Sequence, residues 1–594
     1  MGALFWGWVL FTRGVPMIPT ILLASFATAL VAIIIQKCIY NPILNMGGGF
    51  SIRGLTFVVA GFGMSAILQN AYWLIWGAVS KSYDANFGDP VQLGSVSVQP
   101  VYLVVIVVAL IVMALLHLMF KKTKIGLAMK AVSYNKPISA LMGVNTRFIV
   151  SFAFGLAAFL SSVSGILSAQ IIFVRYNMSA TMLLKAFSAA VIGGLGNVYG
   201  AMLGGLIVGV VETFGSHFIG SAYKDVISFV IMILMLMLRP GGPFFHQDKT
   251  EGLNGGVGMK WNINKLPART KDWILTGMFA IIICLLPLIF SSDYIIHIGC
   301  MIGINILLAL GMHFVTGLAG QINMGQYGFY CIGAYAGALL TTKGGLGFVP
   351  SLIVTIAISA AFGMLVGIPA LKVEGPYLSL CTIGFAESVR LVINSAGWSN
   401  KSNGIMRIPK LEIFGWTMQT KTMSYFFIFV FVLIGLIIVT NFVNSNYGRR
   451  FSAIKDDPLA ASVMGVNVRK VKIMAFVLCA IFAGVAGCLY ANYAGYIHPT
   501  TFVQALQTNF LLMIVLGGLG STWGSVLGAT LITVVYEYTR VYAEYQKIAF
   551  GVVMILTVLF LQRGIVGTIR YHKQQKMIRD QHAGGKNDGK EAAV

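Results

Sequence analysis

Charge is scarce in this chain of 594 residues, and most of it has one sign. Charged residues make up 10% of the sequence, with 41 Lys and Arg against 18 Asp and Glu, whereas 57% of the residues are hydrophobic. A soluble core could not bury so much apolar surface, so the composition places the chain in a lipid bilayer. We expect an all-α fold, a polytopic transmembrane helical bundle, because an open sheet would leave backbone groups unpaired in lipid.

Clusters of catalytic or metal-binding residues are also missing. The eight histidines have no nearby carboxylate or Cys partners, and the seven cysteines show no paired spacing. No Gly-x-x-x-x-Gly-Lys-[Ser/Thr] phosphate loop occurs, since the Gly-Lys pairs Gly585-Lys586 and Gly589-Lys590 precede Asn and Glu. We therefore expect no catalytic residue, metal site or cofactor in this chain. Any ATP that drives it must bind to another chain.

The basic residues gather in short loops beside apolar segments. One group lies at 121–147, a second at 449–472 and a third in the tail after Arg563. This is the positive-inside pattern, which places these loops in the cytoplasm and argues against nucleic-acid binding. Apolar runs such as 101–120 and 294–314 are long enough to span a bilayer, and counting them predicts about 15 to 17 crossings.

The sequence contains one unit twice, over 121–204 and 446–528. Each copy has a basic loop, a Met-Gly-Val-Asn-x-Arg string, an apolar stretch and a Gly-Gly-Leu-Gly sequence. The interval between the first glycine of the loop and the glycine of the string is the same in both copies, Gly126 to Gly143 and Gly448 to Gly465. Two similar halves packed around a shared axis are typical of transport proteins, so the duplication predicts a transport pathway.

The repeat divides the chain into a first half at 1–240 and a second half at 273–565. Between them, 241–272 is a polar, basic segment that predicts a cytoplasmic linker, and 566–594 is a basic tail whose composition predicts disorder. Two polar loops fall on the opposite face of the membrane, at 83–100 and 396–421. The second of these either meets an external partner or serves as a solvated connector.

Glycines spaced four apart follow each Gly-Gly-Leu-Gly, as in Gly196, Gly200 and Gly204 of the first half. One interpretation is a groove for close helix packing. The other is that Gly-Gly-Leu-Gly breaks a membrane helix where the backbone lines a polar cavity. The second interpretation makes the following glycines candidates for the translocation path: Gly193, Gly194, Gly196, Gly517, Gly518 and Gly520.

A further interruption lies at 317–326, where polar residues stand inside an apolar stretch. Uncharged amides at membrane depth need partners, so these residues either line a pathway or form hydrogen bonds between helices. The candidates are Gln321, Asn323, Gly325 and Gln326.

Four charged residues also lie within or near apolar stretches: Lys185, Glu212, Glu387 and Arg390. An isolated charge in a bilayer is costly, so we expect these side chains to pair or to face water. Glu387 and Arg390 are three positions apart and can pair with each other on one helix.

The repeated basic loop predicts a short helix along the cytoplasmic face. In the second half Asp456-Asp457-Pro458 opens like a helix start and small residues lead to Gly465, and Ile138 to Gly143 has the same form in the first half. An alanine face on such a helix suits docking into a groove of a soluble partner, and two helices predict two partner subunits. The candidate coupling residues are Ala131, Ser139, Ala140, Gly143, Ala453, Asp457, Ala460, Ala461 and Gly465.

These residues resemble the branched-chain amino-acid type of ABC importer permease. The second half carries the pattern Gly448, Arg449, Ala453, Ile454, Asp457, Ala460, Ala461, Met464-Gly465-Val466-Asn467, Phe476, Ala483-Gly484, Ala486-Gly487, Pro499 and Gly517-Gly518-Leu519-Gly520. The first half carries Leu68-Gln69-Asn70, Lys185-Ala186-Phe187 and Arg239-Pro240. The resemblance covers nearly the whole chain, with 16–245 similar to one permease subunit and 273–565 similar to the other. Two subunits that are normally separate are fused.

The resemblance implies import of a small solute, usually leucine, isoleucine or valine, and urea or short amides in close relatives. It also implies a solute-binding protein outside, two ATPase subunits carrying ATP and Mg inside, and a place in the cell membrane of a prokaryote. Ala460, Ala461 and Gly465 resemble the coupling motif of ABC importers, although Leu459 stands where many have Glu. The first half departs further, with Pro137-Ile138-Ser139, so docking there is expected to be weaker or asymmetric.

First-half relatives begin with additional spans that carry a polar Asn-Phe-Ala-His-like segment, and this sequence begins after them. We expect upstream spans that end in a broken segment analogous to 321–326. The main alternative function is a secondary transporter or channel that works without ATP, which would not need two matched cytoplasmic loops. A membrane enzyme comes third, for want of any acid, base, metal or nucleophile cluster.

Overall fold

The computed structural model describes residues 17–238 and 292–569, apart from short gaps, together with residues 7, 276–279, 281 and 287. The gaps are 46–49, 78, 81–90, 94–95, 172–173, 177, 195, 374, 414–415, 419 and 562–563. The linker expected at 241–272 and all of the expected tail beyond 569 lie outside the described residues.

Among the described residues, the first half consists of helices and one antiparallel hairpin, in which Gln92 pairs with Ser97. Its elements are α2 (Met17–Ile35), the π-helix η1 (Gln36–Tyr40), α3 (Asn41–Asn45), α4 (Phe50–Trp76), β1 (Val91–Leu93), β2 (Val96–Val98), α5 (Pro100–Lys122), α6 (Lys124–Tyr134), α7 (Lys136–Leu141), α8 (Thr146–Ser168), α9 (Met178–Gly193), α10 (Val198–Ile219), the 3-10 helix η2 (Ser221–Tyr223) and α11 (Lys224–Leu238).

The second half repeats this order after an additional pair of helices, α13 and α14. Its elements are α13 (Asp293–Met312), the π-helix η3 (His313–Leu318), α14 (Gln326–Thr342), α15 (Phe348–Gly367), η4 (Pro369–Leu371), α16 (Pro376–Ser395), η5 (Gly397–Ser399), η6 (Lys401–Asn403), β3 (Glu412–Ile413), β4 (Trp416–Thr417), α17 (Lys421–Val443), α18 (Asn446–Asp456), α19 (Pro458–Val463), α20 (Val468–Ala494), η7 (Pro499–Thr501), α21 (Gln504–Gly517), α22 (Thr522–Thr539), η8 (Arg540–Tyr542) and α23 (Ala543–Phe560).

Twelve helices in the described part of the chain are long and apolar enough to cross a membrane. This confirms the polytopic all-α bundle. The number is lower than the 15 to 17 crossings expected from the sequence. That estimate counted every apolar window, including short helices such as α9, which has 16 residues, and apolar segments outside the described residues.

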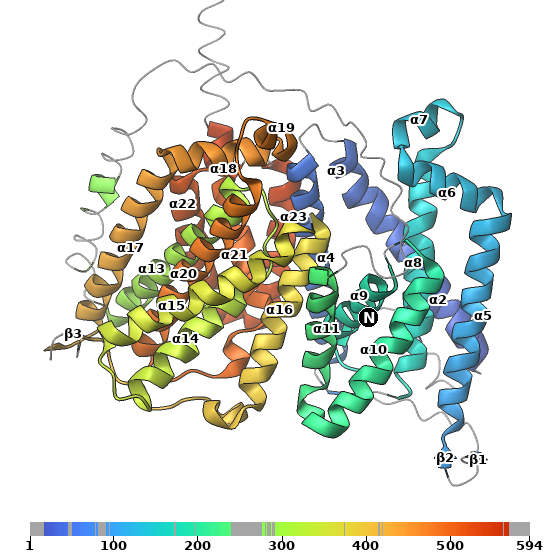
Figure 1. Cartoon of the computed structure of the whole chain (residues 1–594), viewed down its shortest axis with the longest axis horizontal. Helices are drawn as coiled ribbons and strands as arrows, with labels where there is room; N and C mark the ends of the chain where they lie inside the picture. The colour runs from blue at the N-terminus through green and yellow to red at the C-terminus, as the bar shows by residue number, and fades with distance from the viewer. Residues whose placement is uncertain are drawn as a thin grey trace, which may run out of the picture.

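The two halves pack against each other reciprocally. Helix α4 of the first half lies along α23 of the second, and α16 of the second half lies along α11 of the first (Figure 1). The first contact is close because both helices carry glycine: a Cβ on Gly63 would lie 3.1 Å from the Gly551 carbonyl oxygen. In chain order α4 corresponds to α16, and α11 to α23. Each half therefore contributes the equivalent two helices to the interface, which is the pseudo-twofold arrangement that the sequence repeat predicts.

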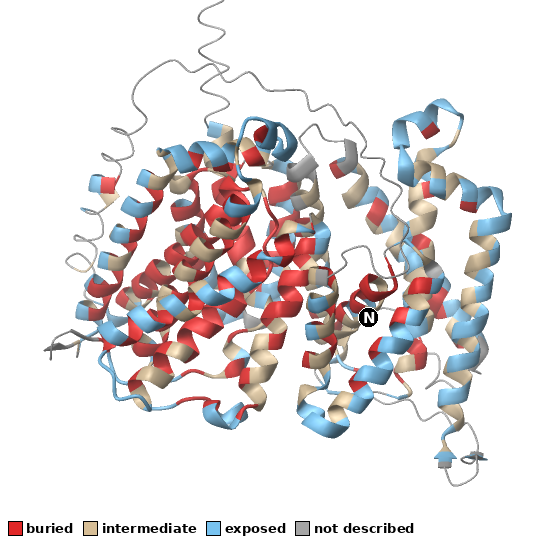
Figure 2. Ribbon diagram, viewed as in Figure 1, coloured by how far each residue is buried: buried red, intermediate tan, exposed pale blue. Residues whose placement is uncertain are grey.

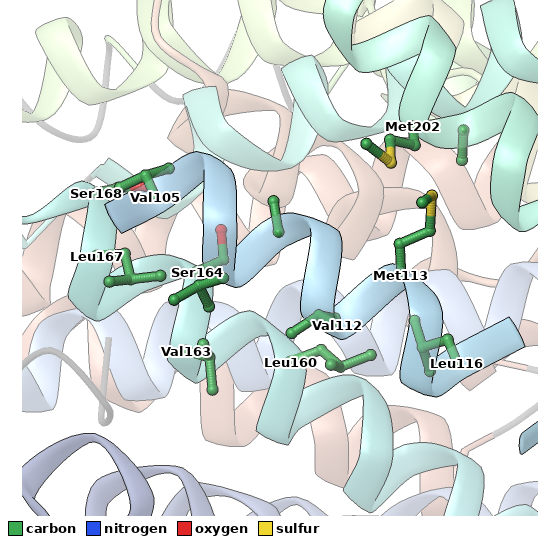
Figure 3. A pocket seen from close by; sticks show the side chains of 13 residues that line it. Val105, Val112, Met113, Leu116, Leu160, Val163, Ser164, Leu167, Ser168 and Met202 are labelled. Carbon is green, nitrogen blue, oxygen red and sulfur yellow. The ribbon is translucent and has the colours of Figure 1, made fainter. Parts of the chain in front are cut away.

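Burial differs between the halves (Figure 2). Helices α13, α14 and α20 of the second half are largely buried, whereas α5 of the first half has no buried residue. In the second half α13 packs against α17, α20 and α22. The corresponding helices of the first half, α5, α8 and α10, instead line an apolar cavity of about 460 Å³ (Figure 3). Met113, Leu160 and Met202 come from these three helices and border the cavity.

Candidate functional site

The two predicted coupling helices, α7 and α19, lie on the same face of the molecule, opposite the β1–β2 hairpin (Figure 1). Each begins with a side-chain cap: the Asn135 carboxamide oxygen accepts from the Ile138 amide at 3.0 Å, and an Asp457 carboxylate oxygen accepts from the Leu459 amide at 2.8 Å. Such caps satisfy backbone donors that have no partner inside the helix. Two short helices of the same construction therefore form on one surface.

Both coupling helices end at a glycine in the left-handed region. Gly143 has φ +84° and Gly465 has φ +82°, and the Gly465 amide donates to the Ser462 carbonyl at 3.0 Å. A Cβ on either glycine would meet nothing within 4 Å. Glycine is needed here for its backbone conformation and not for space, as is usual after the last turn of a helix.

The alanine face that the sequence predicts for docking is partly turned inward. Ser139 and Ala461 are buried against their own chain, and their role in coupling stays a prediction. Other candidates do reach the surface, namely Ala140, Gly143, Asp457, Ala460 and Gly465, which are exposed, whereas Ala131 of α6 and Ala453 of α18 are partly buried.

Large apolar side chains project outward instead, and sequence reasoning missed them. Met142 is 79% exposed and Met464 is 84% exposed. The rest of this exposed apolar set is Ile138, Leu141, Leu459 and Val463. The sequence did contain a signal for this surface: large apolar residues stand in an otherwise basic loop, where they do not contribute to solubility. Exposed apolar groups on a short fixed helix are typical of a docking surface.

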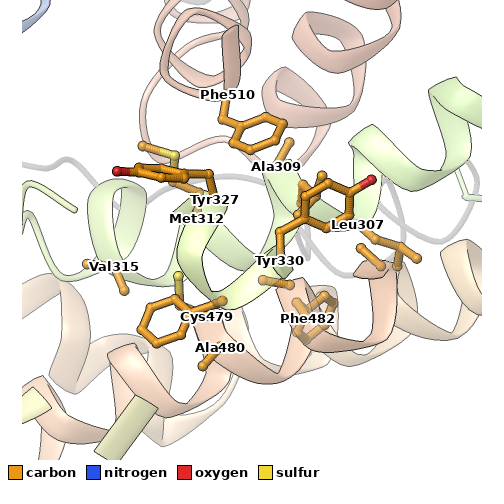
Figure 4. Packing of buried hydrophobic residues seen from close by; sticks show 14 of the residues in the cluster. Leu307, Ala309, Met312, Val315, Tyr327, Tyr330, Cys479, Ala480, Phe482 and Phe510 are labelled. Atoms are coloured by element: carbon orange, nitrogen blue, oxygen red, sulfur yellow. The ribbon is translucent and has the colours of Figure 1, made fainter. Parts of the chain in front are cut away.

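The interruption predicted at 317–326 is real. Helix α13 continues into the π-helix η3, the chain then runs without regular structure over 319–325, and α14 begins at Gln326. Met312 at the end of α13, Val315 of η3 and Tyr327 of α14 belong to one cluster of buried hydrophobic residues (Figure 4). The segment is enclosed, since the whole stretch from Gln321 to Gln326 is buried.

The polar side chains of the broken segment hold three helices together. The Gln326 side-chain amide donates to the Leu308 carbonyl at 3.2 Å, and its oxygen accepts from the Cys479 thiol at 2.7 Å. Asn323 donates to the same Gln326 oxygen at 3.4 Å and accepts from the Gly325 amide at 2.9 Å. The structure thus shows the interhelical hydrogen bonding that was one of two interpretations, and pathway lining stays a prediction.

Some polar atoms beside this network are buried without a hydrogen-bond partner in the described structure. They include Gln321 Oε1, Gln507 Oε1 and His313 Nε2. Buried polar groups are normally paired, so unpaired polar atoms in and beside a helix break are candidates for contact with a polar solute. Of the sequence-predicted residues, Gln321 is therefore better placed than Gln326 to meet a solute.

Both Gly-Gly-Leu-Gly sequences break a helix. Helix α9 ends at Gly193 and α21 ends at Gly517, and the following turns contain glycines with φ between +85° and +118°. These turn glycines are Gly194, Gly196, Gly518 and Gly520.

The glycines spaced four apart inside α10 and α22 serve helix packing. A Cβ on Gly204 would lie 2.1 Å from the Ala189 carbonyl oxygen, and one on Gly528 would lie 1.8 Å from the Met513 carbonyl oxygen. These packing glycines bring α10 against α9 and α22 against α21. Gly196 and Gly520 are not packing glycines of these helices, although the spacing suggested it. They precede the helices, because α10 begins at Val198 and α22 at Thr522.

Of the two turn glycines Gly196 and Gly520, Gly520 is the one that lies close to the broken segment in the described structure. A Cβ on Gly520 would lie 3.6 Å from the Gly317 carbonyl oxygen, whereas one on Gly196 would meet nothing within 4 Å. Gly325 itself faces α16, since a Cβ there would lie 2.5 Å from the Thr382 carbonyl oxygen. The first half reaches the segment through α4, where a Cβ on Gly54 would lie 3.8 Å from Ile322.

The charged residues in apolar stretches are paired, as expected. Lys185 forms ion pairs of 2.7 Å with both Glu212 and Asp225, and Ser228 donates to Glu212 at 2.7 Å. Arg390 Nε donates to Glu387 Oε1 at 3.1 Å on the same helix. Within the described residues, no three His, Cys, Asp or Glu side chains lie together in a way that could hold a metal ion.

Replacing Glu212 with Gln is expected to lower the free energy of unfolding by about 1–3 kcal/mol, because a buried carboxylate that pairs with Lys185 and, at 3.4 Å, with Lys224 is lost. The thermal unfolding midpoint in detergent measures this. The control is Asp293→Asn, which breaks the exposed pair with Lys421 at 3.3 Å and should cost less than about 1 kcal/mol. Equal midpoints for the Glu212 variant and the unaltered protein would contradict the prediction.

Comparison with known proteins identifies the family. The family described as branched-chain amino acid transport system / permease component matches the chain twice, at residues 1–236 and 294–558. The chain belongs to this family. Its membership of the permease family makes it a transport component and not an enzyme, and the two separate matches confirm that two permease units are fused.

Three curated relatives of this permease illustrate the match. The chain is 31% identical to the high-affinity branched-chain amino acid transport system permease protein LivM of Escherichia coli (strain K12), over 62% of this chain and 92% of LivM. It is 32% identical to BraD of Pseudomonas aeruginosa, over 39% of this chain and 76% of BraD. It is 31% identical to LivH of Escherichia coli (strain K12), over 35% of this chain and 68% of LivH. No solved structure matches the permease.

Proposed function

We propose that this permease carries branched-chain amino acids, or a closely related small solute, into the cell. The observation that carries the proposal is the family match to both halves, together with relatives whose names specify branched-chain amino acid transport. The unpaired buried acceptors beside the broken segment, such as Gln321 Oε1, fit a solute that carries an ammonium group.

Two ATPase subunits that carry ATP and Mg are proposed to dock on α7 and α19. The support is the matched pair of capped helices with exposed apolar residues on one face. Each helix is fixed at its start by an Asx cap and at its end by a glycine turn, so a partner that pushes on it displaces the loop as a unit. The differing sequences of α7 and α19 predict unequal docking of the two subunits.

A solute-binding protein is proposed to meet the opposite face. The loop after η6 is held against the end of α20, because Ile405 and Ile497 exchange two backbone hydrogen bonds of 3.0 and 3.1 Å. Met406 and Tyr496 are exposed next to this bridge, and Trp398 of η5 is exposed as well. A fixed loop with exposed aromatic and apolar side chains is suited to protein contact.

Uptake of labelled leucine by cells that produce the whole transport system tests the substrate class. We expect unlabelled isoleucine and valine to compete for leucine uptake and urea to have no effect. Competition by urea with no effect of valine would assign the permease to another solute.

A further inference from the structure

Lys455 lies near the end of α18 and reaches inward from the cytoplasmic face. Its Nζ donates to the Gly317 carbonyl at 2.8 Å, across 138 positions of sequence. Gly317 belongs to η3, the π-helical end of α13 that leads into the broken segment. One side chain therefore joins the loop that carries α19 to the place where the membrane helix is interrupted.

The contact has a clear physical cause. A helix that stops leaves its last carbonyls without partners and concentrates negative partial charge there. In η3 the Ala319 amide donates to Phe314 and the Gln321 amide to Val315, both near 3 Å. The Gly317 carbonyl is instead satisfied by a cation, which suits a helix C-terminus. Burial lowers the pKa of Lys455, and the charge of the neighbouring Asp456 partly opposes this shift.

The turn between α21 and α22 closes over the same contact. A Cβ on Gly520 would lie 3.4 Å from Lys455 Nζ and 3.6 Å from the Gly317 oxygen. Lys455 also stands two residues before Asp457, the cap of α19. The coupling helix, the broken segment and the α21–α22 turn thus meet at one ammonium group.

The first half has no such lysine. Aligning the repeated loops by Gly126 with Gly448 and by Gly143 with Gly465 places Ser133 at the position of Lys455. The Ser133 hydroxyl donates to the Lys130 carbonyl within its own helix at 2.7 Å. The long-range contact therefore belongs to the second half.

We propose that Lys455 is a positioning residue that transmits displacement of α19 to the broken segment, so that ATP-driven movement on the cytoplasmic face changes the shape of the pathway. This rests on the proposed docking of an ATPase at α19. Loss of the contact should uncouple ATP hydrolysis from transport without removing the ATPase.

The test compares Lys455→Met, Lys455→Arg and Lys470→Met in the full chain, purified with its ATPase subunits and reconstituted in liposomes with the binding protein. We expect Lys455→Met to lower leucine uptake per ATP hydrolysed by about tenfold, a usual size for a coupling contact. Lys455→Arg should restore most of the ratio because it keeps a cationic donor. Lys470 is exposed at the start of α20 and serves as the control, with an unchanged ratio.

An unchanged ratio in Lys455→Met, or an arginine variant no better than the methionine variant, would overturn the proposal. If the methionine variant does not fold, Lys455→Gln, which keeps an N–H donor without the charge, is expected to show an intermediate loss, and a normal ratio in it would overturn the role of the charge. If the unaltered protein shows no ATP-dependent uptake, the proposed function itself fails, and this outcome is distinct from failure of Lys455 alone.

Discussion

Replacing Gly465 with Trp is expected to abolish ATP-dependent uptake while leaving the protein in the membrane. Gly465 has φ +82°, a conformation that costs an L-residue about 1–2 kcal/mol. A Cβ there would meet nothing within 4 Å, so an indole would project from the surface beside Met464. A bulky group at the centre of a docking surface should reduce uptake by about a hundredfold, the loss that follows disruption of a central interface contact.

The matched variant is Gly143→Trp, in which φ is +84° and the surroundings are equally open. The backbone cost is the same in both halves, so a difference in uptake reports the docking of the partner. We expect a smaller loss for Gly143→Trp because α7 has Ile138 and Ser139 where α19 has Ala460 and Ala461. Uptake by membrane vesicles and co-purification of the ATPase measure the two effects. Normal uptake with bound ATPase in Gly465→Trp would refute the assignment of α19.

Replacing Gln326 with Leu is expected to destabilise the bundle and to lower uptake by about tenfold or more. The change removes the acceptor of Cys479 and Asn323 and the donor to Leu308, and each buried polar group left unpaired costs about 1–3 kcal/mol. Without these bonds the α13–α14 break is not held in one shape. The unfolding midpoint in detergent and leucine uptake measure the effect.

Gln321→Leu separates structure from transport at the same break. Gln321 is buried, but its Oε1 has no partner in the described structure, so its loss should leave the unfolding midpoint nearly unchanged. If the segment lines the pathway, uptake should nevertheless fall. Normal uptake in Gln321→Leu would leave hydrogen bonding between helices as the sole role of the segment. An unchanged unfolding midpoint in Gln326→Leu would contradict that role as well.

Local features of the site could be predicted from the sequence because they depend on neighbouring residues. Asn135 and Asp457 cap helices through side chains two or three positions from their partners, and Gly465 ends a helix through its own backbone. The duplication made these signals visible twice. The same locality explains why a helix break at each Gly-Gly-Leu-Gly was one of the two interpretations that the sequence supports.

Features that depend on distant packing could not be predicted. Which side of α19 faces inward is decided by its packing on α18 and α20, so the burial of Ala461 could not be predicted from the sequence. The contact of Lys455 with Gly317 joins positions far apart in sequence. Glycine spacing alone also cannot distinguish a turn glycine from a packing glycine within a helix. Gly196 precedes the start of α10 and Gly200 follows it, and the spacing does not show where the helix begins.

The central claim is that this chain forms a pathway that ATP hydrolysis on partner subunits drives. Purified protein, reconstituted in liposomes with its ATPase subunits and solute-binding protein, tests it through the accumulation of labelled leucine. We expect labelled leucine to accumulate against its gradient. This accumulation should require ATP, Mg and the binding protein, and it should stop when Gly465 is replaced with Trp. Leucine flux of equal rate without ATP or the ATPase subunits would show a channel or secondary transporter and would contradict the account.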